Sequence, residues 1–429
     1  MIFEGKVRRL GERVVRLGDE LAHVDMVRTS RGWLRVGAMP EIAKLLVLAK
    51  TPPHYVVVLP GEVTEVGDGI TGEEFIFWSS INAAKFAGTY IGTEAALRTL
   101  HAYLEPAVSY YLNEELTSIT RRDWLDTLYC PHPIGVDNVA RFGPLEIGLE
   151  GERVQVRDGG RLLYDDRQTV PIGIPSRVQA VLDSVPRSQE TIGRLDVLVV
   201  GSGNGHLGNA SSFILRYGDR RVWVDPSARP HETLAAHGVH WDDVTDVLVT
   251  HIHEDHCAGL TACLAHARRR GNGLRLLTTR PSLEALQRRF GDRIPDLASQ
   301  LEFQEIEPGR GAQVGEAEFE FRLNHHNLPS GALGFKVRFN GRCLGISGDT
   351  KYDEEIIRRL GRPELRAEWF GDCHLVFHEV DLVRPRSVHS YYVEVEKLAR
   401  QIPGRLLVYH TLGNTHPLEM AQEGKRYTV

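Results

Sequence analysis

The residues that most constrain this chain are His251-Ile252-His253-Glu254-Asp255-His256, which directly follow the apolar segment 246–250. That segment has the composition of a buried β-strand, so the three histidines and Asp255 begin where the strand ends. Burying unpartnered imidazole nitrogens costs roughly 1–3 kcal/mol each, and protonated histidines repel one another. A transition metal removes both penalties, because neutral imidazole and carboxylate are ligands of zinc, manganese and iron. The cluster therefore predicts a metal site.

The spacing within the cluster predicts which of its residues bind the same metal ion. His251 and His253 are two residues apart at the end of a strand and can converge on one ion. Asp255 and His256 follow just past the bend and would point towards a second ion. Of the 19 histidines, 15 lie at or after His206, so we expect the chemistry in the second half of the chain.

The composition excludes several other classes of protein. The chain has 429 residues, of which 42% are hydrophobic and 25% charged, as in soluble proteins of two or three domains. Five cysteines without a CxxC pair indicate neither a disulfide framework nor a thiolate zinc site. No apolar stretch is long enough to span a membrane, and the charged start lacks a secretory signal, so we expect a cytoplasmic protein. The net charge of −6 weakens a general role in coating nucleic acid.

Prolines 171, 175 and 186 indicate a linker over residues 166–194. It would separate a mixed α+β domain of unknown role, residues 1–165, from a second domain, residues 195–429. In the first domain we expect a helix over 40–50, a strand over 55–59, two helices around Gly88–Gly92, and a hairpin turning at 158–160. No catalytic group of residues is recognisable there.

The second domain alternates many short strands with helices, which predicts an α/β fold of two sheets with helices outside, an αββα sandwich. The predicted strands are 196–200, 212–216, 221–225, 246–250, 274–278, 317–323, 333–339, 342–347, 374–378 and 405–409. The predicted helices are 258–270, 281–290, 353–360 and 390–401.

The pattern His-x-His-x-Asp-His resembles the signature of the metallo-β-lactamase superfamily, whose fold is this sandwich. Later segments match in order, beginning with a strand–loop–strand over 201–226 that ends in Asp225. The resemblance implies further ligands at His326, Asp349 and His410. His325 is the alternative to His326, which we favour because His326-x-x-Pro329 fits the superfamily motif.

The resemblance also implies how these ligands divide between two divalent ions, zinc or else manganese. The first ion would be held by His251, His253 and His326, the second by Asp255, His256 and His410, with Asp349 bridging them. Two such ions would share a bridging hydroxide and clamp the oxygens of an in-line displacement.

A narrower resemblance, over about 196–416, is to RNase Z-type phosphodiesterases. His378-Glu379-Val380 is similar to their HEA motif and His389-Ser390-Tyr391 to their HST motif, although Tyr391 replaces threonine. The resemblance implies that His389 stabilises the transition-state phosphate and helps to protonate the leaving oxygen. Glu379 would orient His389. The last motif also departs from the family's HxSxRY, because Thr411-Leu412-Gly413-Asn414 follows His410.

The substrate is less constrained than the metal site. RNase Z carries an arm for transfer RNA between the histidine of the third motif and the bridging aspartate, but His326 and Asp349 are only 23 positions apart. We therefore expect a phosphodiesterase of small or cyclic nucleotides, without a transfer-RNA substrate. An RNA or single-strand nuclease, and hydrolysis of carboxyl or lactone esters, remain alternatives. So does a sensor or assembly protein whose first domain binds a protein partner, and a homodimer is compatible with the family.

Overall fold

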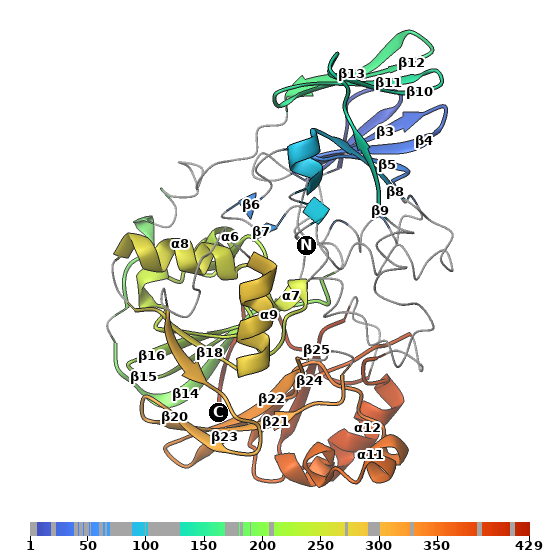
Figure 1. Ribbon diagram of the computed structural model, residues 1–429. Coiled ribbons are helices and arrows are strands. Elements are labelled where there is room, and N and C mark those ends of the chain that lie inside the picture. The colour runs from blue at the N-terminus through green and yellow to red at the C-terminus, as the bar shows by residue number, and fades with distance from the viewer. Residues whose placement is uncertain are drawn as a thin grey trace. The chain divides into compact units, whose positions relative to one another are not determined.

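Figure 1 shows the protein as a computed structural model. The structure describes residues 7–18, 23–37, 53–59, 88–98, 129–167, 183–188, 190–205, 210–270, 273–290, 301–326, 330–383, 388–411 and 417–429, with positions 42, 46, 51, 63–64, 67–68, 100–101 and 180. The chain divides into two compact units, Met1–Pro175 with Arg288–Gly291, and Ser176–Gln287 with Asp292–Val429. The expected domains 1–165 and 195–429 and the linker 166–194 stay predictions.

The first unit contains a seven-stranded sheet, in the order β1-β2-β3-β4-β5-β8-β9, and a four-stranded antiparallel sheet, β10 to β13. The larger sheet is antiparallel from β1 to β4 and parallel from β4 to β9. Its strands are β1 (Val7–Arg9), β2 (Val14–Gly18), β3 (His23–Thr29), β4 (Gly32–Val36), β5 (Tyr55–Val57), β8 (Gly88–Gly92) and β9 (Tyr129–Pro133). The smaller sheet consists of β10 (Val139–Phe142), β11 (Leu145–Glu150), β12 (Arg153–Asp158) and β13 (Arg161–Arg167). Two short strands, β6 (Val63–Thr64) and β7 (Gly67–Asp68), pair with each other.

Alternating apolar side chains hold the first unit together. Val27 and Leu34 of the larger sheet join Ile147 and Val156 of the smaller sheet in one buried cluster. The predicted hairpin at 158–160 is confirmed, because Gly159 and Gly160 turn between β12 and β13 with positive φ. Gly88–Gly92, expected as a break between helices, instead forms β8, which the parallel strands on both sides bury. Most of the expected helix 40–50 lies outside the described residues.

The second unit contains two sheets that share one core. Their orders are β19-β18-β17-β16-β15-β14-β26 and β20-β21-β22-β23-β24-β25. The first comprises β14 (Ile192–Ser202), β15 (Ser211–Gly218), β16 (Arg220–Val224), β17 (Asp246–Leu248), β18 (Arg275–Thr278), β19 (Glu302–Glu305) and β26 (Arg426–Thr428). The second comprises β20 (Gly311–Val314), β21 (Ala317–Leu323), β22 (Leu333–Phe339), β23 (Arg342–Ile346), β24 (Leu375–Glu379) and β25 (Arg405–Tyr409). Phe213 of the first sheet packs on Phe377 and Tyr409 of the second, so the sheets lie face to face.

Helices follow the strands of both sheets. They are α6 (Pro230–Ala236), α7 (Glu254–Cys257), α8 (Leu260–Arg270), α9 (Arg280–Phe290), α11 (Glu354–Leu360) and α12 (Tyr392–Gln401), with short 3₁₀ turns η2 (Trp241–Asp243), η4 (Pro363–Leu365) and η5 (Ala367–Phe370). Ile357 of α11 and Leu398 of α12 pack against Val376 and Val408, on the face of the second sheet that points away from the shared core. Figure 1 shows α11 and α12 side by side near the C-terminal end of the colour scale. The mixed α/β class predicted for this half is confirmed.

The predicted strands and helices of this half match the structure closely. The strands 317–323, 333–339 and 405–409 have the observed bounds, and the start of α11 is explained by Asp353, whose side chain accepts a hydrogen bond from the Ile356 amide. Strands β19, β20 and β26 and helix α6 were not predicted, because they are short and carry few apolar residues. Among the described residues, no helix is long and apolar enough to cross a membrane.

Candidate metal centre

The residues predicted as ligands all follow the ends of strands. The cluster His251–His256 begins three residues after the end of β17, with Asp255 and His256 on α7, and His326 follows β21. Asp349 follows β23, and His410 comes directly after β25. Strands β16 to β18 are parallel, as are β23 to β25, so within each sheet the carboxyl ends lie at one edge. Side chains that follow such strands converge in an α/β fold.

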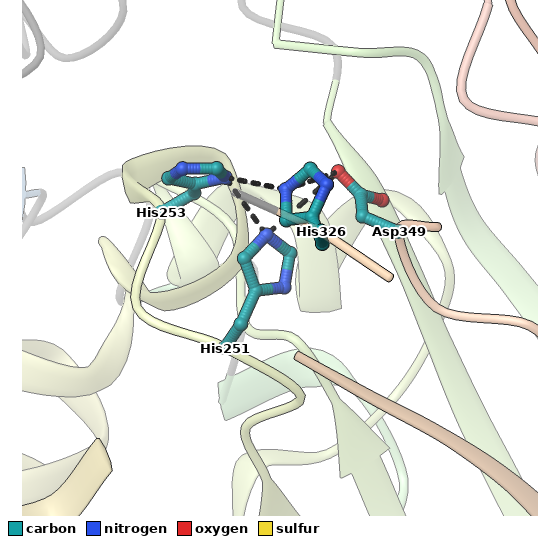
Figure 2. Close-up of side chains that lie close together, drawn as sticks. All are labelled: His251, His253, His326 and Asp349. Atoms are coloured by element: carbon teal, nitrogen blue, oxygen red, sulfur yellow. Dashed lines mark hydrogen bonds and ion pairs between the residues drawn. The ribbon is translucent and has the colours of Figure 1, made fainter. Parts of the chain in front are cut away.

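Four of these side chains form the first cluster, which is shown in Figure 2. His253 Nδ1 lies 2.9 Å from His251 Nε2 and 3.3 Å from His326 Nε2. Asp349 Oδ2 lies 3.7 Å from His251 Nε2 and 3.9 Å from His326 Nε2. One ligand atom from each of the four residues lies within 4.8 Å of every other, so a single cation can contact them all.

Asp255, His256 and His410 form a second cluster within the same 4.8 Å limit. Nε2 of His410 lies 3.7 Å from Asp255 Oδ2, and Nε2 of His256 lies 3.8 Å from Asp255 Oδ1. Asp349 Oδ2 lies 3.3 Å from His410 Nε2 and 3.5 Å from His256 Nε2. Asp349 is therefore within reach of both clusters, and the resemblance implied a bridging carboxylate at this residue.

The donor atoms of both clusters fit divalent metal ions. Among the described residues, Nε2 of His256, Nε2 of His410 and Oδ1 of Asp349 are buried and have no hydrogen-bond partner. Buried polar atoms are normally satisfied, and imidazole with carboxylate is a donor set that zinc and manganese accept. The structure thus supports a metal centre, while the number and identity of the ions stay predictions.

The protonation states of the first cluster suit metal binding as well. Burial and neighbouring imidazoles lower the pKa of His251 and of His253 well below the ordinary value, and burial lowers the pKa of His326 to about 3. Burial alone would raise the pKa of Asp349, but His410 and His256 hold it well below the ordinary value. Neutral imidazoles and an ionised carboxylate are the forms that bind a metal.

Asp225 has a part in the site that the sequence analysis did not assign to it. Its Oδ2 accepts a hydrogen bond from His256 Nδ1 at 2.8 Å, while the amide and hydroxyl of Thr250 donate to its two oxygens, each at 2.7 Å. Fixing the proton on Nδ1 leaves Nε2 of His256 facing the second cluster. Asp225 lies directly after the buried strand β16, and that position is the only sequence signal for it.

Asn324 holds the turn that carries Asp349, and sequence reasoning missed it too. Its amide donates to the carbonyl oxygens of Ser347, at 2.7 Å, and of Asp349, at 2.9 Å. Gly348 lies between them with a φ of 59°, and a Cβ there would come within 2.0 Å of the Leu333 carbonyl oxygen. Only glycine fits this turn, so the backbone before Asp349 is fixed from two sides.

His389 and Glu379 lie beside the second cluster. His389 Nδ1 is 3.3 Å from Glu379 Oε2 and 3.7 Å from Asp349 Oδ2, and the ring centroids of His389 and His410 are 4.7 Å apart. The other oxygen of Glu379 accepts hydrogen bonds from the amides of Thr350 and Ser390, both at 3.0 Å, which fixes the carboxylate. Burial opposes protonation of His389, yet the pair with Glu379 raises its pKa to about 9.

His378, the other histidine of this segment, points away from the clusters. Its Nδ1 donates to the Glu379 carbonyl oxygen at 2.8 Å, and its ring packs edge-on against Tyr352 and Phe370. Burial lowers its pKa to about 3, so the ring is neutral. This environment is that of a structural histidine at a strand end.

The structure places His326 in the first cluster and leaves His325 half-buried beside it. We expect His326→Ala to weaken metal affinity at least about 100-fold, because the cluster loses a nitrogen ligand. His325→Ala is the matched control and should change the affinity by no more than about twofold. Titration with Zn²⁺ and metal analysis after gel filtration measure both variants. Weaker binding only in His325→Ala would reverse the assignment.

Comparison with known proteins gives matches over the same half of the chain. The family model "Anti-Pycsar protein Apyc1" matches residues 195–428. The Anti-Pycsar protein Apyc1 of Paenibacillus sp. (strain J14) is 26% identical over 229 residues, 51% of this chain and 88% of that protein. The cGMP-dependent 3',5'-cGMP phosphodiesterase A of Dictyostelium discoideum is 26% identical over 250 residues, 54% of this chain and 28% of that protein.

A second Dictyostelium discoideum relative, the cAMP/cGMP-dependent 3',5'-cAMP/cGMP phosphodiesterase B, is 23% identical over 50% of this chain and 20% of its own length. The chain thus spans less than a third of the two Dictyostelium relatives. Two solved structures are also similar. The metallo-β-lactamase fold protein YhfI from Bacillus subtilis (16% identity, TM-score 0.45) matches 54% of this chain and 99% of its own. The short form of human tRNase Z (15% identity, TM-score 0.45) matches 54% of this chain and 98% of its own.

The two Dictyostelium relatives carry the names of phosphodiesterases, which is the class of hydrolase that the sequence predicted. The family model extends from β14 to the last strand, β26, and includes every residue of both clusters together with Glu379 and His389. Because this match covers more than half of the sequence, the chain belongs to the Anti-Pycsar protein Apyc1 family.

Proposed function

We propose that the second unit is a dinuclear metal-dependent phosphodiesterase and that its substrate is a small or cyclic nucleotide. The observation that carries the proposal is the joining of two His/Asp clusters at Asp349, with the His389–Glu379 pair beside them. The names of the relatives support the substrate class, since two are cyclic-nucleotide phosphodiesterases.

The residues of the two clusters would hold one ion each. These are His251, His253 and His326 for the first, Asp255, His256 and His410 for the second, and Asp349 for both. Zinc is the favoured metal and manganese the alternative, on the donor set. Such a metal pair, when bound, makes a water nucleophilic at neutral pH and neutralises charge on the phosphate oxygens.

His389 has the position of a proton donor to the leaving oxygen. In phosphodiester hydrolysis a water oxygen bonds to phosphorus, the bond from phosphorus to the leaving oxygen breaks, and that oxygen takes up a proton. The pKa of about 9 keeps His389 protonated at neutral pH, and 18% of its side chain is exposed, so substrate can reach it. Glu379 holds Nδ1, which directs Nε2 to the substrate. General acid catalysis of this kind contributes about 10²–10⁴-fold.

The segment between His326 and Asp349 favours a small substrate. Its described part, residues 330–349, is filled by β22 and β23, which pair as an antiparallel hairpin from Phe335 with Ile346 to Phe339 with Arg342. Such a hairpin offers no extended arm for a folded RNA, and the net charge of −6 provides no general attraction to a polyanion.

The proposal is tested by metal removal and substrate comparison on the full chain. We expect chelation to lower hydrolysis of 3',5'-cyclic nucleotides and bis(p-nitrophenyl) phosphate at least about 100-fold, and Zn²⁺ or Mn²⁺ to restore it. Circular dichroism before and after chelation shows whether the fold is kept. Undiminished turnover by folded protein that metal analysis shows to be metal-free would refute the metal-dependent mechanism.

The same assay distinguishes the alternatives. A nuclease would cleave single-stranded oligonucleotides faster than cyclic nucleotides, with an affinity that falls steeply with salt. A sensor or assembly protein would bind nucleotide or a protein partner without turnover at any metal loading. Preferred hydrolysis of cyclic nucleotides, with little dependence on salt, is the result that we expect.

A further inference from the structure

Two cysteines outside the metal centre lie in contact in the core of the second unit. The sulfur atoms of Cys343 and Cys373 are 3.1 Å apart, although the residues are 30 positions apart in the sequence. Both thiols are buried, with exposures of 4% and 2%, in the apolar cluster between β23, β24 and the helices α11 and α12. No CxxC motif is present in the sequence, so their spacing does not predict that they pair.

The backbone holds this pair from both sides. Strands β23 and β24 are parallel, with Leu344 opposite Leu375. The His374 amide donates to the Cys343 carbonyl oxygen at 2.8 Å, and the Cys343 amide donates to Nδ1 of His374 at 3.1 Å. The position of each Cβ is therefore set by the sheet, and the short distance between the sulfur atoms follows from the strand register.

Gly345 provides the space for the second sulfur. A Cβ on Gly345 would lie 3.2 Å from Cys373 Sγ and 2.7 Å from the Phe370 ring. A larger residue would push Cys373 and the ring apart. The fold thus keeps room for two sulfur atoms side by side.

The two thiols could instead belong to a metal site, since Asp372 lies within 4.8 Å of both. The Asp372 carboxylate is already paired, with Arg338 Nε at 3.0 Å and with Lys336 Nζ at 3.4 Å. Two cations beside the only carboxylate of the group disfavour a further cation. Since the described residues offer these two thiols no third ligand that is free of other cations, the thiols are better suited to forming a bond with each other.

We propose that Cys343 and Cys373 form a redox modification site, which a two-electron oxidant of the peroxide class converts into an intramolecular disulfide. One sulfur attacks a peroxide oxygen, the O–O bond breaks, and a sulfenic acid and one water form. The second sulfur attacks the sulfenic sulfur, the S–O bond breaks, and a second water leaves. Two thiol hydrogens are lost and the peroxide is reduced to two waters, so atoms and electrons balance.

The disulfide would cross-link the segment that carries Asp349. The cross-link closes a loop between Cys343 and Cys373, which contains Asp349 and α11, and such a loop costs the unfolded chain conformational entropy. We expect the thermal midpoint of the oxidised protein to rise by roughly 5–10 °C. The neighbouring Cys343 thiol and burial raise the pKa of Cys373, so the reaction on the folded protein should be slow.

The first test uses the full wild-type chain, treated with hydrogen peroxide or with dithiothreitol and then alkylated in denaturant. We expect the five cysteines to give five alkylated thiols after reduction and three after oxidation. Peptide mapping should join the Cys343 and Cys373 peptides, with a mass about 2 Da below the sum of the two thiol peptides. Five remaining thiols, a disulfide between other cysteines, or only sulfinic and sulfonic products would overturn the proposal.

Variants provide the second test. Cys343→Ser and Cys373→Ser should each abolish the rise in thermal midpoint on oxidation, whereas Cys130→Ser and Cys263→Ser are matched controls that should keep it. Because the mapping needs no variant, the proposal stays testable if a serine variant fails to fold. Neither measurement depends on the phosphodiesterase proposal, so the two can fail separately.

Discussion

Asp349→Ala is expected to release most of the bound metal and to lower hydrolysis of cyclic nucleotides by about 10³-fold or more. The reason is the central place of this carboxylate, whose Oδ2 lies 3.3–3.9 Å from ring nitrogens in both clusters. Without it, the two proposed ions would have no shared negative charge between them. Metal analysis and initial rates on the same protein preparation measure the two effects together.

Asp372→Ala is the matched control for this variant. Asp372 lies in the same β23–β24 segment, but its carboxylate is half exposed and pairs with Arg338 and Lys336. We expect metal content to be unchanged and the rate to be within about twofold of the wild type. Full metal content and full activity in Asp349→Ala would show that Asp349 is not a ligand of the catalytic ions.

His389→Ala is expected to lower turnover of cyclic nucleotides by about 10²–10⁴-fold while metal content stays at the wild-type level. The structure places His389 beside Asp349 and His410 but holds it through Glu379. Its proposed role predicts that the loss depends on the leaving group. A nucleoside alkoxide needs a proton to leave, whereas p-nitrophenolate does not, so bis(p-nitrophenyl) phosphate should lose only about tenfold.

Two further variants separate this role from a general structural effect. Glu379→Gln should show the same dependence on the leaving group with a smaller loss, about 10–100-fold, since Glu379 acts through His389. His374→Ala removes an exposed imidazole at the opposite end of β24 and should leave both rates unchanged. Equal losses for both substrates, or loss of metal from His389→Ala, would contradict the role as proton donor.

Much of the second unit could be predicted because its signals are local. Long apolar runs such as 333–339 and 405–409 are typical of buried strands. Their predicted bounds agree with the structure. The strand Glu302–Glu305 was not predicted because polar residues occupy most of the segment. It forms a strand through its pairing with β18. In the first unit, Gly88–Gly92 forms a strand for the same reason, since its neighbours β5 and β9 supply the hydrogen bonds.

The sequence by itself determined the chemistry of the centre. Ligands two and five residues apart, as in His251, His253 and His256, remain neighbours in any compact fold, so their pattern carries information before the fold is known. Only the tertiary structure decided which distant groups complete them. Asp225 reaches His256, Asn324 holds the turn before Asp349, and Cys343 meets Cys373 through the register of β23 and β24. Such contacts depend on how strands pair over long separations, and residue spacing along the chain does not encode that pairing locally.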